Sequence, residues 1–138
     1  QTEGAAVSVV YDVDNDGANA VGSELGARVA ASPEDLIGGD DVDAVAICSS
    51  TDTHIDLLVA AAEAGKPVFI EKPLSHDLGE VDRGLAAVEA AGIAVQVGFN
   101  RRFDASHKAV RDQVHAGAVG DVQMVRITSR DPAPPPIS

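Results

Sequence analysis

Apolar runs of strand length alternate along this chain with segments of helical periodicity. The strand-like runs lie at residues 5–11, 28–30, 43–49, 67–70, 93–99 and 121–128. Helices are expected at residues 18–26, 33–38, 55–62, 78–92 and 104–116. Parallel strands joined by helical crossovers form βαβ units, so the order predicts an α/β fold: a doubly wound, Rossmann-like parallel sheet.

Two segments carry the clearest patterns. Ile55, Leu58, Val59 and Ala62 follow the i, i+3, i+4, i+7 spacing of a helix with one buried face, and Gly65 supplies a stop. The run 43–49 is almost continuously apolar, which is typical of a strand buried on both faces of a sheet. The proline-rich end, residues 131–136, cannot continue a strand ladder and is expected to be extended.

Charge excludes two classes of partner. The 138 residues carry 22 acidic and 10 basic side chains, a net charge of −12. Such a surface repels phosphates at long range, so neither nucleic acid nor an anionic membrane surface is expected as a partner. Cys48 is the one cysteine, which indicates a reducing compartment, and we expect a cytoplasmic protein without a membrane span.

Lys72 is the first candidate for chemistry. It follows the apolar run 67–70, and ligands of open parallel sheets lie beyond the carboxyl ends of the strands. The alternative is a solvated lysine at the start of a loop, as most lysines are exposed. His76, His107 and His115 show no metal-ligand spacing with one another or with Cys48, so no metal site is expected.

Three segments resemble the glucose-fructose oxidoreductase / inositol dehydrogenase family: residues 49–75, 95–104 and 127–136. The most specific element is Glu71-Lys72-Pro73 after a strand. The resemblance implies a dinucleotide-binding domain over residues 1–117 that lacks its first strand and glycine-rich loop. Residues 118–138 would then begin a substrate and oligomerisation domain, with the first strand of an α+β fold. The chain is accordingly expected to be an internal fragment without turnover of its own.

The resemblance also implies NAD as cofactor. Asp12 would accept hydrogen bonds from the adenosine ribose, and with Asp14 and Asp16 would repel a 2′-phosphate; the alternative is an ordinary acidic turn. Ser49, Ser50 and Thr51 would border the nicotinamide, although helix capping at Thr51 or Asp52 is equally compatible. His54 is expected near the cofactor or in a structural role, and Glu71 would contact the cofactor or orient its loop.

Catalysis and substrate binding are implied for three further residues. Lys72 would hold the hydroxyl being oxidised and work with an aspartate and a histidine expected beyond Ser138. Arg101 and Asp131 would bind the polyol substrate, whereas the alternative for Arg101 and Arg102 is a pair of surface arginines. Whether the Lys72-Pro73 peptide bond is cis cannot be deduced from these residues.

The implied activity is an NAD-dependent dehydrogenation that moves hydride from the 2-hydroxyl of myo-inositol to NAD. Two alternatives stay open. One is a dehydrogenase of another sugar or inositol isomer in the same family. The other is a non-catalytic, nucleotide-sensing regulatory member, which would have no need of Lys72. The whole protein is expected to be a homo-oligomer, either a dimer or a tetramer.

Overall fold

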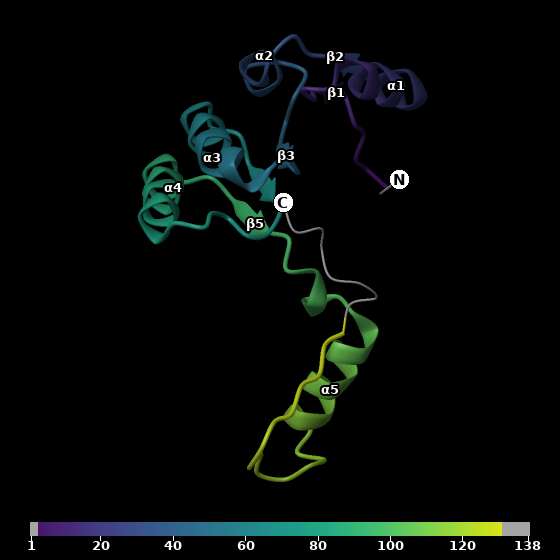
Figure 1. Cartoon of the computed structure of the whole chain (residues 1–138), viewed down its shortest axis with the longest axis vertical. Helices are drawn as coiled ribbons and strands as arrows, with labels where there is room; N and C mark the ends of the chain where they lie inside the picture. Colours follow the sequence, from purple (N-terminus) through teal and green to yellow (C-terminus); the bar gives the residue numbers. More distant parts are fainter. Residues whose placement is uncertain (1–2, 131–138) are drawn as a thin grey trace. The chain divides into compact units, whose positions relative to one another are not determined.

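The computed structural model describes residues 3–130, and the chain divides into two compact units between Phe99 and Asn100. Figure 1 shows the order of the elements along each unit. Each unit is described by itself below. In the part of the chain that the structure describes, no helix is both long enough and apolar enough to cross a membrane.

The first unit alternates strands and helices, as predicted. Its elements are β1 (Val9–Val10), α1 (Asn15–Leu25), β2 (Arg28–Val29), α2 (Pro33–Ile37), β3 (Val45–Ile47), a 3₁₀ turn (Thr51–Thr53), α3 (His54–Glu63), β4 (Val68–Ile70), α4 (Leu78–Ala91) and β5 (Val95–Val97). All described strand pairs are parallel: β1 pairs with β2, and β3, β4 and β5 form a sheet in that order. The α/β interpretation is therefore confirmed.

Helix α1 begins three residues before the predicted start. The Asp14 side chain accepts a hydrogen bond from the Asp16 N–H, which caps the helix at Asn15. Gly26 ends it with φ of 69°, a left-handed conformation that favours glycine. Gly22 lies buried inside this helix, where an added Cβ would come 2.8 Å from Val29 Cγ2. Its lack of a side chain lets α1 pack closely on β2.

The core lies between the β3–β5 sheet and helices α3 and α4. Every second residue of β3 and β4 is buried, and Ile55, Leu58 and Ala61 of α3 join the same cluster. Gly84 of α4 is buried too, and a Cβ there would lie 3.1 Å from Ile55 Cδ1. The strong helical periodicity predicted from Ile55 onward is thus the face that α3 presents to the core.

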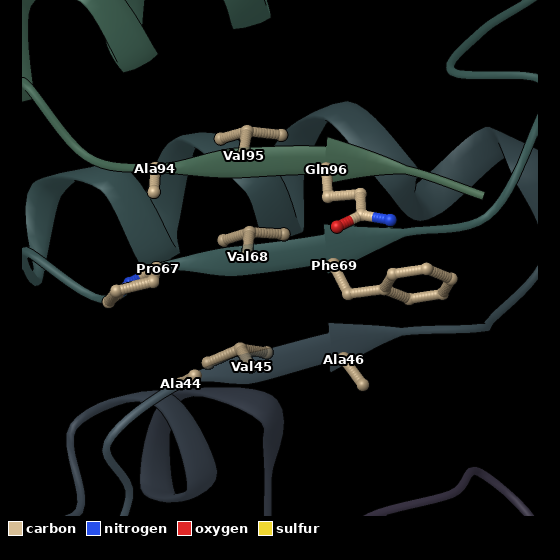
Figure 2. Close-up of a pocket in the computed structure, with 9 residues that line it drawn as sticks. All are labelled: Ala44, Val45, Ala46, Pro67, Val68, Phe69, Ala94, Val95 and Gln96. Carbon is tan, nitrogen blue, oxygen red and sulfur yellow. The ribbon is translucent and has the colours of Figure 1, made fainter. Parts of the chain in front are cut away.

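The opposite face of this sheet is open over residues 44–46, 67–69 and 94–96. Figure 2 shows these residues on three adjacent strands, with the register partners Ala46, Phe69 and Gln96 aligned across the strands. They line a shallow hollow of about 460 Å³, and Phe69 is 37% exposed. The alternation of buried and exposed positions in β3 and β4 follows directly from the two-residue period of a strand.

The second unit contains a 3₁₀ turn (Asn100–Arg102) and helix α5 (Ala105–His115). The predicted strand over 121–128 is wrong for this structure, because residues 121–130 form neither helix nor strand. An extended segment needs a neighbouring strand to satisfy its backbone, and no described residue provides one. A domain boundary after residue 117 stays a prediction, and Asp131 with the proline-rich end lies outside the described residues.

The cap of α5 should be sensitive to acid. Asp104 Oδ1 accepts a hydrogen bond from the His107 N–H (3.0 Å) and lies 2.9 Å from His107 Nδ1. The hydrogen bond from the His107 side chain is the main cause that lowers the pKa of Asp104 from 3.8 to about 2. Because the folded pKa is the lower one, the stabilisation is present above the unfolded value and is lost as the pH falls through the folded value.

We therefore expect the first turn of α5 to lose amide protection between about pH 4 and pH 2. Hydrogen exchange of the His107 and Lys108 amides, followed by NMR, measures this. Asp104→Asn is the matched control, since asparagine also caps a helix but does not titrate. An equally steep loss in Asp104→Asn would show that another group is responsible.

Candidate functional site

The carboxyl ends of β3, β4 and β5 meet at one edge of the sheet. Ile47, Ile70 and Val97 are register partners across the three strands. The Glu71 N–H donates to the Ile47 carbonyl oxygen (2.9 Å), and the Gly98 N–H donates to the Ile70 carbonyl oxygen (2.8 Å). These bonds place the residues that follow β3, β4 and β5, namely Cys48, Glu71 and Gly98, next to one another. Ligands of open parallel sheets bind at this edge.

The Glu71 carboxylate lies over Gly98. A Cβ on Gly98 would come 2.9 Å from Glu71 Oε1 and 3.0 Å from Oε2, so glycine is what leaves room for this carboxylate. Glu71 Oε2 accepts a hydrogen bond from the Lys72 N–H (3.2 Å). Cys48 is an exposed residue, yet partial desolvation of its thiol raises its pKa, and the Glu71 charge raises it further. Glu71 therefore sits in the middle of the site rather than at its rim.

Lys72 begins the loop after β4 and its side chain is exposed. The Lys72-Pro73 peptide bond is cis. Within residues 3–130 the Lys72 ammonium forms neither a hydrogen bond nor an ion pair. An ammonium without a protein partner at a strand end is available to a ligand, and it is equally compatible with a solvated lysine.

The loop after β3, residues 49–53, is rich in hydroxyl side chains that form hydrogen bonds within the loop. Ser49 Oγ and Thr53 Oγ1 are 2.7 Å apart, and the Thr53 hydroxyl donates to the Ser50 carbonyl oxygen (2.8 Å). Ser50 precedes the 3₁₀ turn and Thr53 precedes α3, yet neither side chain makes a capping hydrogen bond. Thr51 and Asp52 lie inside the turn rather than at a helix cap. Ser49 and Ser50 are exposed, so contact of this loop with a cofactor stays a prediction.

His54 is the buried polar residue of the site, with 1% of its surface exposed. Its Nδ1 is 2.9 Å from the Pro73 carbonyl oxygen, and its Nε2 is 3.0 Å from the Ser49 carbonyl oxygen. Each ring nitrogen therefore lies within hydrogen-bond distance of a backbone carbonyl oxygen. The expected place of His54 near the cofactor stays a prediction, while its role in joining two loops is visible in the geometry.

Asp12 lies just beyond β1, in the separate β1–β2 sheet. Its side chain is exposed, and its Oδ1 accepts a hydrogen bond from the Asp14 N–H (2.9 Å). The three acidic residues of this turn differ in role: Asp14 caps α1 and Asp16 lies in its first turn. Asp12 alone presents a carboxylate that serves neither purpose. This supports, and does not test, its predicted contact with a ribose.

Arg101 belongs to the second unit. Its Nη1 is 4.0 Å from Asp104 Oδ2, and the side chain is 68% exposed. Four neighbours from the same turn and helix join it around a basic hollow of about 310 Å³: Arg102, His107, Lys108 and Arg111. Binding of a polyol by Arg101 stays a prediction, as does the role of Asp131, which lies outside the described residues.

Sequence reasoning missed Cys48, Gly98 and the backbone carbonyl of Pro73. Gly98 carried a usable signal, because a glycine at the end of an apolar strand often marks a close approach. Pro73 carried none, since a carbonyl partner cannot be deduced from a side chain. Among residues 3–130 there is no group of three His, Cys, Asp or Glu side chains arranged to hold a metal ion.

The position of the Glu71 carboxylate can be tested through Cys48. Glu71→Gln should lower the pKa of the Cys48 thiol, because the charge that disfavours the thiolate is removed. Burial, the larger cause, remains, so the thiol should still titrate above its ordinary value. The measurement is the pH dependence of Cys48 alkylation by iodoacetamide, quantified by peptide mass spectrometry. Asp77→Asn, at the exposed cap of α4, is the control, and an unchanged Cys48 profile in Glu71→Gln would place the carboxylate elsewhere.

Comparison with known families identifies the larger part of the chain. A family model described as "Oxidoreductase family, NAD-binding Rossmann fold" matches residues 1–99. The myo-inositol 2-dehydrogenase of Thermotoga maritima is 44% identical over 134 residues, which is 96% of this chain and 40% of the relative. The inositol 2-dehydrogenase of Rhizobium meliloti is 50% identical over 97 residues, or 70% of this chain and 29% of the relative.

A solved structure gives the same result. The scyllo-inositol dehydrogenase of Lactobacillus casei, determined with NAD(H) and scyllo-inositol bound, is 30% identical and has a TM-score of 0.79. The match covers 83% of this chain and 34% of that protein. The chain thus spans about 40% or less of the length of these relatives.

Proposed function

Since the chain belongs to the NAD-binding oxidoreductase family of glucose-fructose oxidoreductase and inositol dehydrogenase, we propose that the whole protein oxidises the 2-hydroxyl of myo-inositol with NAD. The supporting observation from the structure is the exposed Lys72 ammonium at the carboxyl end of β4, next to the contact between the half-buried Glu71 and Gly98. Similarity to the Thermotoga maritima enzyme over nearly the whole chain supports the choice of substrate.

The residues present fit NAD. Asp12 presents an exposed carboxylate, fixed by the Asp14 N–H, that can accept both hydroxyl protons of an adenosine ribose. Arg28, a residue of β2, is paired with Asp35 and Asp41, and these carboxylates would compete with a 2′-phosphate for it. On this proposal Ser49, Ser50, Thr51 and Glu71 border the nicotinamide end. A negatively charged turn and a neutral ribose are compatible, whereas a phosphate there would be repelled.

On this proposal Lys72 stabilises charge at the substrate oxygen. NAD supplies the hydride acceptor. The Lys72 ammonium would donate a hydrogen bond to the hydroxyl oxygen and stabilise the negative charge that develops on this oxygen as its proton leaves. The proton passes to a base, expected to be an aspartate–histidine pair of the second domain. Lys72 keeps its own proton throughout, so its part is electrostatic and orienting.

Myo-inositol has an alternative as the substrate of the whole protein. The Lactobacillus casei relative is named for scyllo-inositol, the isomer that differs at one hydroxyl, and it shares this fold. We keep another inositol isomer or sugar as the alternative substrate. A regulatory, non-catalytic role is less well supported, because it gives the unpartnered Lys72 no task. The homo-oligomeric state and the cytoplasmic location remain predictions.

Removal of the Lys72 ammonium should affect turnover far more than cofactor binding. Loss of one electrostatic stabiliser typically lowers kcat by about 10²–10³-fold, so Lys72→Met should do the same with a nearly unchanged Kd for NAD. NADH formation from myo-inositol by the complete protein measures kcat, and calorimetry measures NAD binding. Lys108→Met, which removes an exposed α5 lysine, is the matched control. A kcat for Lys72→Met close to that of Lys108→Met would remove Lys72 from the chemistry.

The role of Asp12 can be separated from that of its acidic neighbour. Asp12→Asn should raise the Kd for NAD by about ten- to a hundredfold, because hydrogen bonds to a charged group contribute about 1.5–3 kcal/mol. It should also narrow the preference for NAD over NADP, since the repulsion of a 2′-phosphate falls. Asp14→Asn is the control, because asparagine keeps the cap of α1. Equal losses of NAD affinity in the two variants would assign the effect to the turn as a whole.

A further inference from the structure

We propose that His54 is a positioning residue that fixes the Lys72 loop against the loop after β3. It touches neither substrate nor cofactor in this assignment and acts through the Pro73 carbonyl. The kinetic part of the inference rests on the proposed function of Lys72. The structural part, a buried imidazole that braces two loops, stands on the geometry alone.

Two hydrogen-bond contacts of the His54 ring, to the Pro73 and Ser49 carbonyls, make up the link that we call the brace. His54 Nδ1 faces the carbonyl oxygen of Pro73 at 2.9 Å, and Nε2 faces the carbonyl oxygen of Ser49 at 3.0 Å. Carbonyl oxygens only accept, so each bond needs a proton on the ring nitrogen. A neutral imidazole donates to one of the two and the imidazolium to both. In either form at least one N–H···O=C bond joins the start of α3 to a neighbouring loop.

The two carbonyls depend on this side chain. The backbone ladder ends where Glu71 bonds to Ile47 and Gly98 bonds to Ile70. Beyond that line, neither the Ser49 nor the Pro73 carbonyl accepts a backbone hydrogen bond from a described residue. The ring nitrogens of His54 are the protein groups that face these two carbonyls, which the sheet cannot reach. One of these carbonyls belongs to Pro73, the residue directly after Lys72.

His54 is well placed to hold the loop still. It is the first residue of α3, and its neighbour Ile55 is buried in the core against Gly84 of α4. The ring is 1% exposed, so it has little freedom to rotate away. Lys72, in contrast, is exposed, and among residues 3–130 its one side-chain-mediated hydrogen bond runs from its N–H to the Glu71 carboxylate. On this proposal the start of α3 anchors the backbone from which the Lys72 side chain extends.

Leu74 should keep the loop folded when the His54 hydrogen bonds are removed. It packs against the hydrophobic core, and the Ser75 hydroxyl accepts a hydrogen bond from the Asp77 N–H at the cap of α4. Substitution of His54 should consequently loosen the position of Lys72 more than it unfolds the loop. This difference separates a positioning role from a purely structural one.

The two ring nitrogens can be replaced one at a time. The amide nitrogen of asparagine takes the place of Nδ1, and that of glutamine takes the place of Nε2. His54→Asn keeps the bond to Pro73 and should retain most of kcat. His54→Gln keeps only the bond to Ser49, and His54→Leu keeps neither. Both should lose up to about 10²-fold in kcat, because a displacement of about 1 Å at a reacting group has that effect.

The Kd for NAD should stay near the wild-type value in all three variants of the complete protein. His76→Asn, an exposed histidine of the same loop, is the matched control and should be neutral. Equal kcat values for His54→Asn and His54→Gln would overturn the assignment to the Pro73 carbonyl. A large rise in Kd for NAD with kcat preserved would show a direct cofactor contact instead.

An experiment without substitution tests the brace in the wild-type protein. A buried N–H that donates to a carbonyl exchanges slowly with water, so NMR should show a protected ring N–H signal that disappears in His54→Asn. Absence of any such signal would overturn the brace, whatever the kinetics show. If the wild-type protein does not oxidise myo-inositol, the proposed function fails, while this signal still decides the role of His54.

Discussion

The site depends on the register of the parallel ladder formed by β3, β4 and β5. Ile47, Ile70 and Val97 are partners, so the residues after them arrive at one edge together. A slip of one residue in any strand would turn its buried side chains to the open face, where Ala46 and Phe69 now lie. Burial of the alternate positions against α3 and α4 therefore fixes the same register that brings Cys48, Glu71 and Gly98 to adjacent strand ends.

The acidic composition of this chain is compatible with NAD binding, because its charged side chains serve different purposes. Arg28 and Arg83, two of the basic residues in the first unit, are each held by two carboxylates on the surface. Asp14, Asp77 and Asp104 cap helices. Lys72 is left with an exposed ammonium, and Asp12 with an exposed carboxylate. The net charge of −12 thus says little about the local field at the carboxyl ends of the strands.

The elements that the sequence predicted well are those with a strong local cause. The helix beginning near Ile55 has both periodicity and a glycine stop, and α2 has Ser32 as cap and Pro33 in its first turn. The strands were predicted too long, because apolar residues continue beyond the paired region. In β1 only Val9–Val10 pair with β2, whereas the whole run 5–11 has a strand-like composition. The strand expected at 121–128 had apolar residues, but no segment within residues 3–130 pairs with it. Pairing is non-local, and composition does not reveal it.

The sequence by itself determined the fold class, the family and the residue types at the strand ends, because each follows from short patterns along the chain. Only the tertiary structure decided how these residues are used. It showed that Glu71 lies against Gly98, and that His54 is buried between the Ser49 and Pro73 carbonyls rather than open to solvent. Those contacts join residues from different strands and loops. Their geometry arises from the register of the sheet and the packing of α3, which no local pattern encodes.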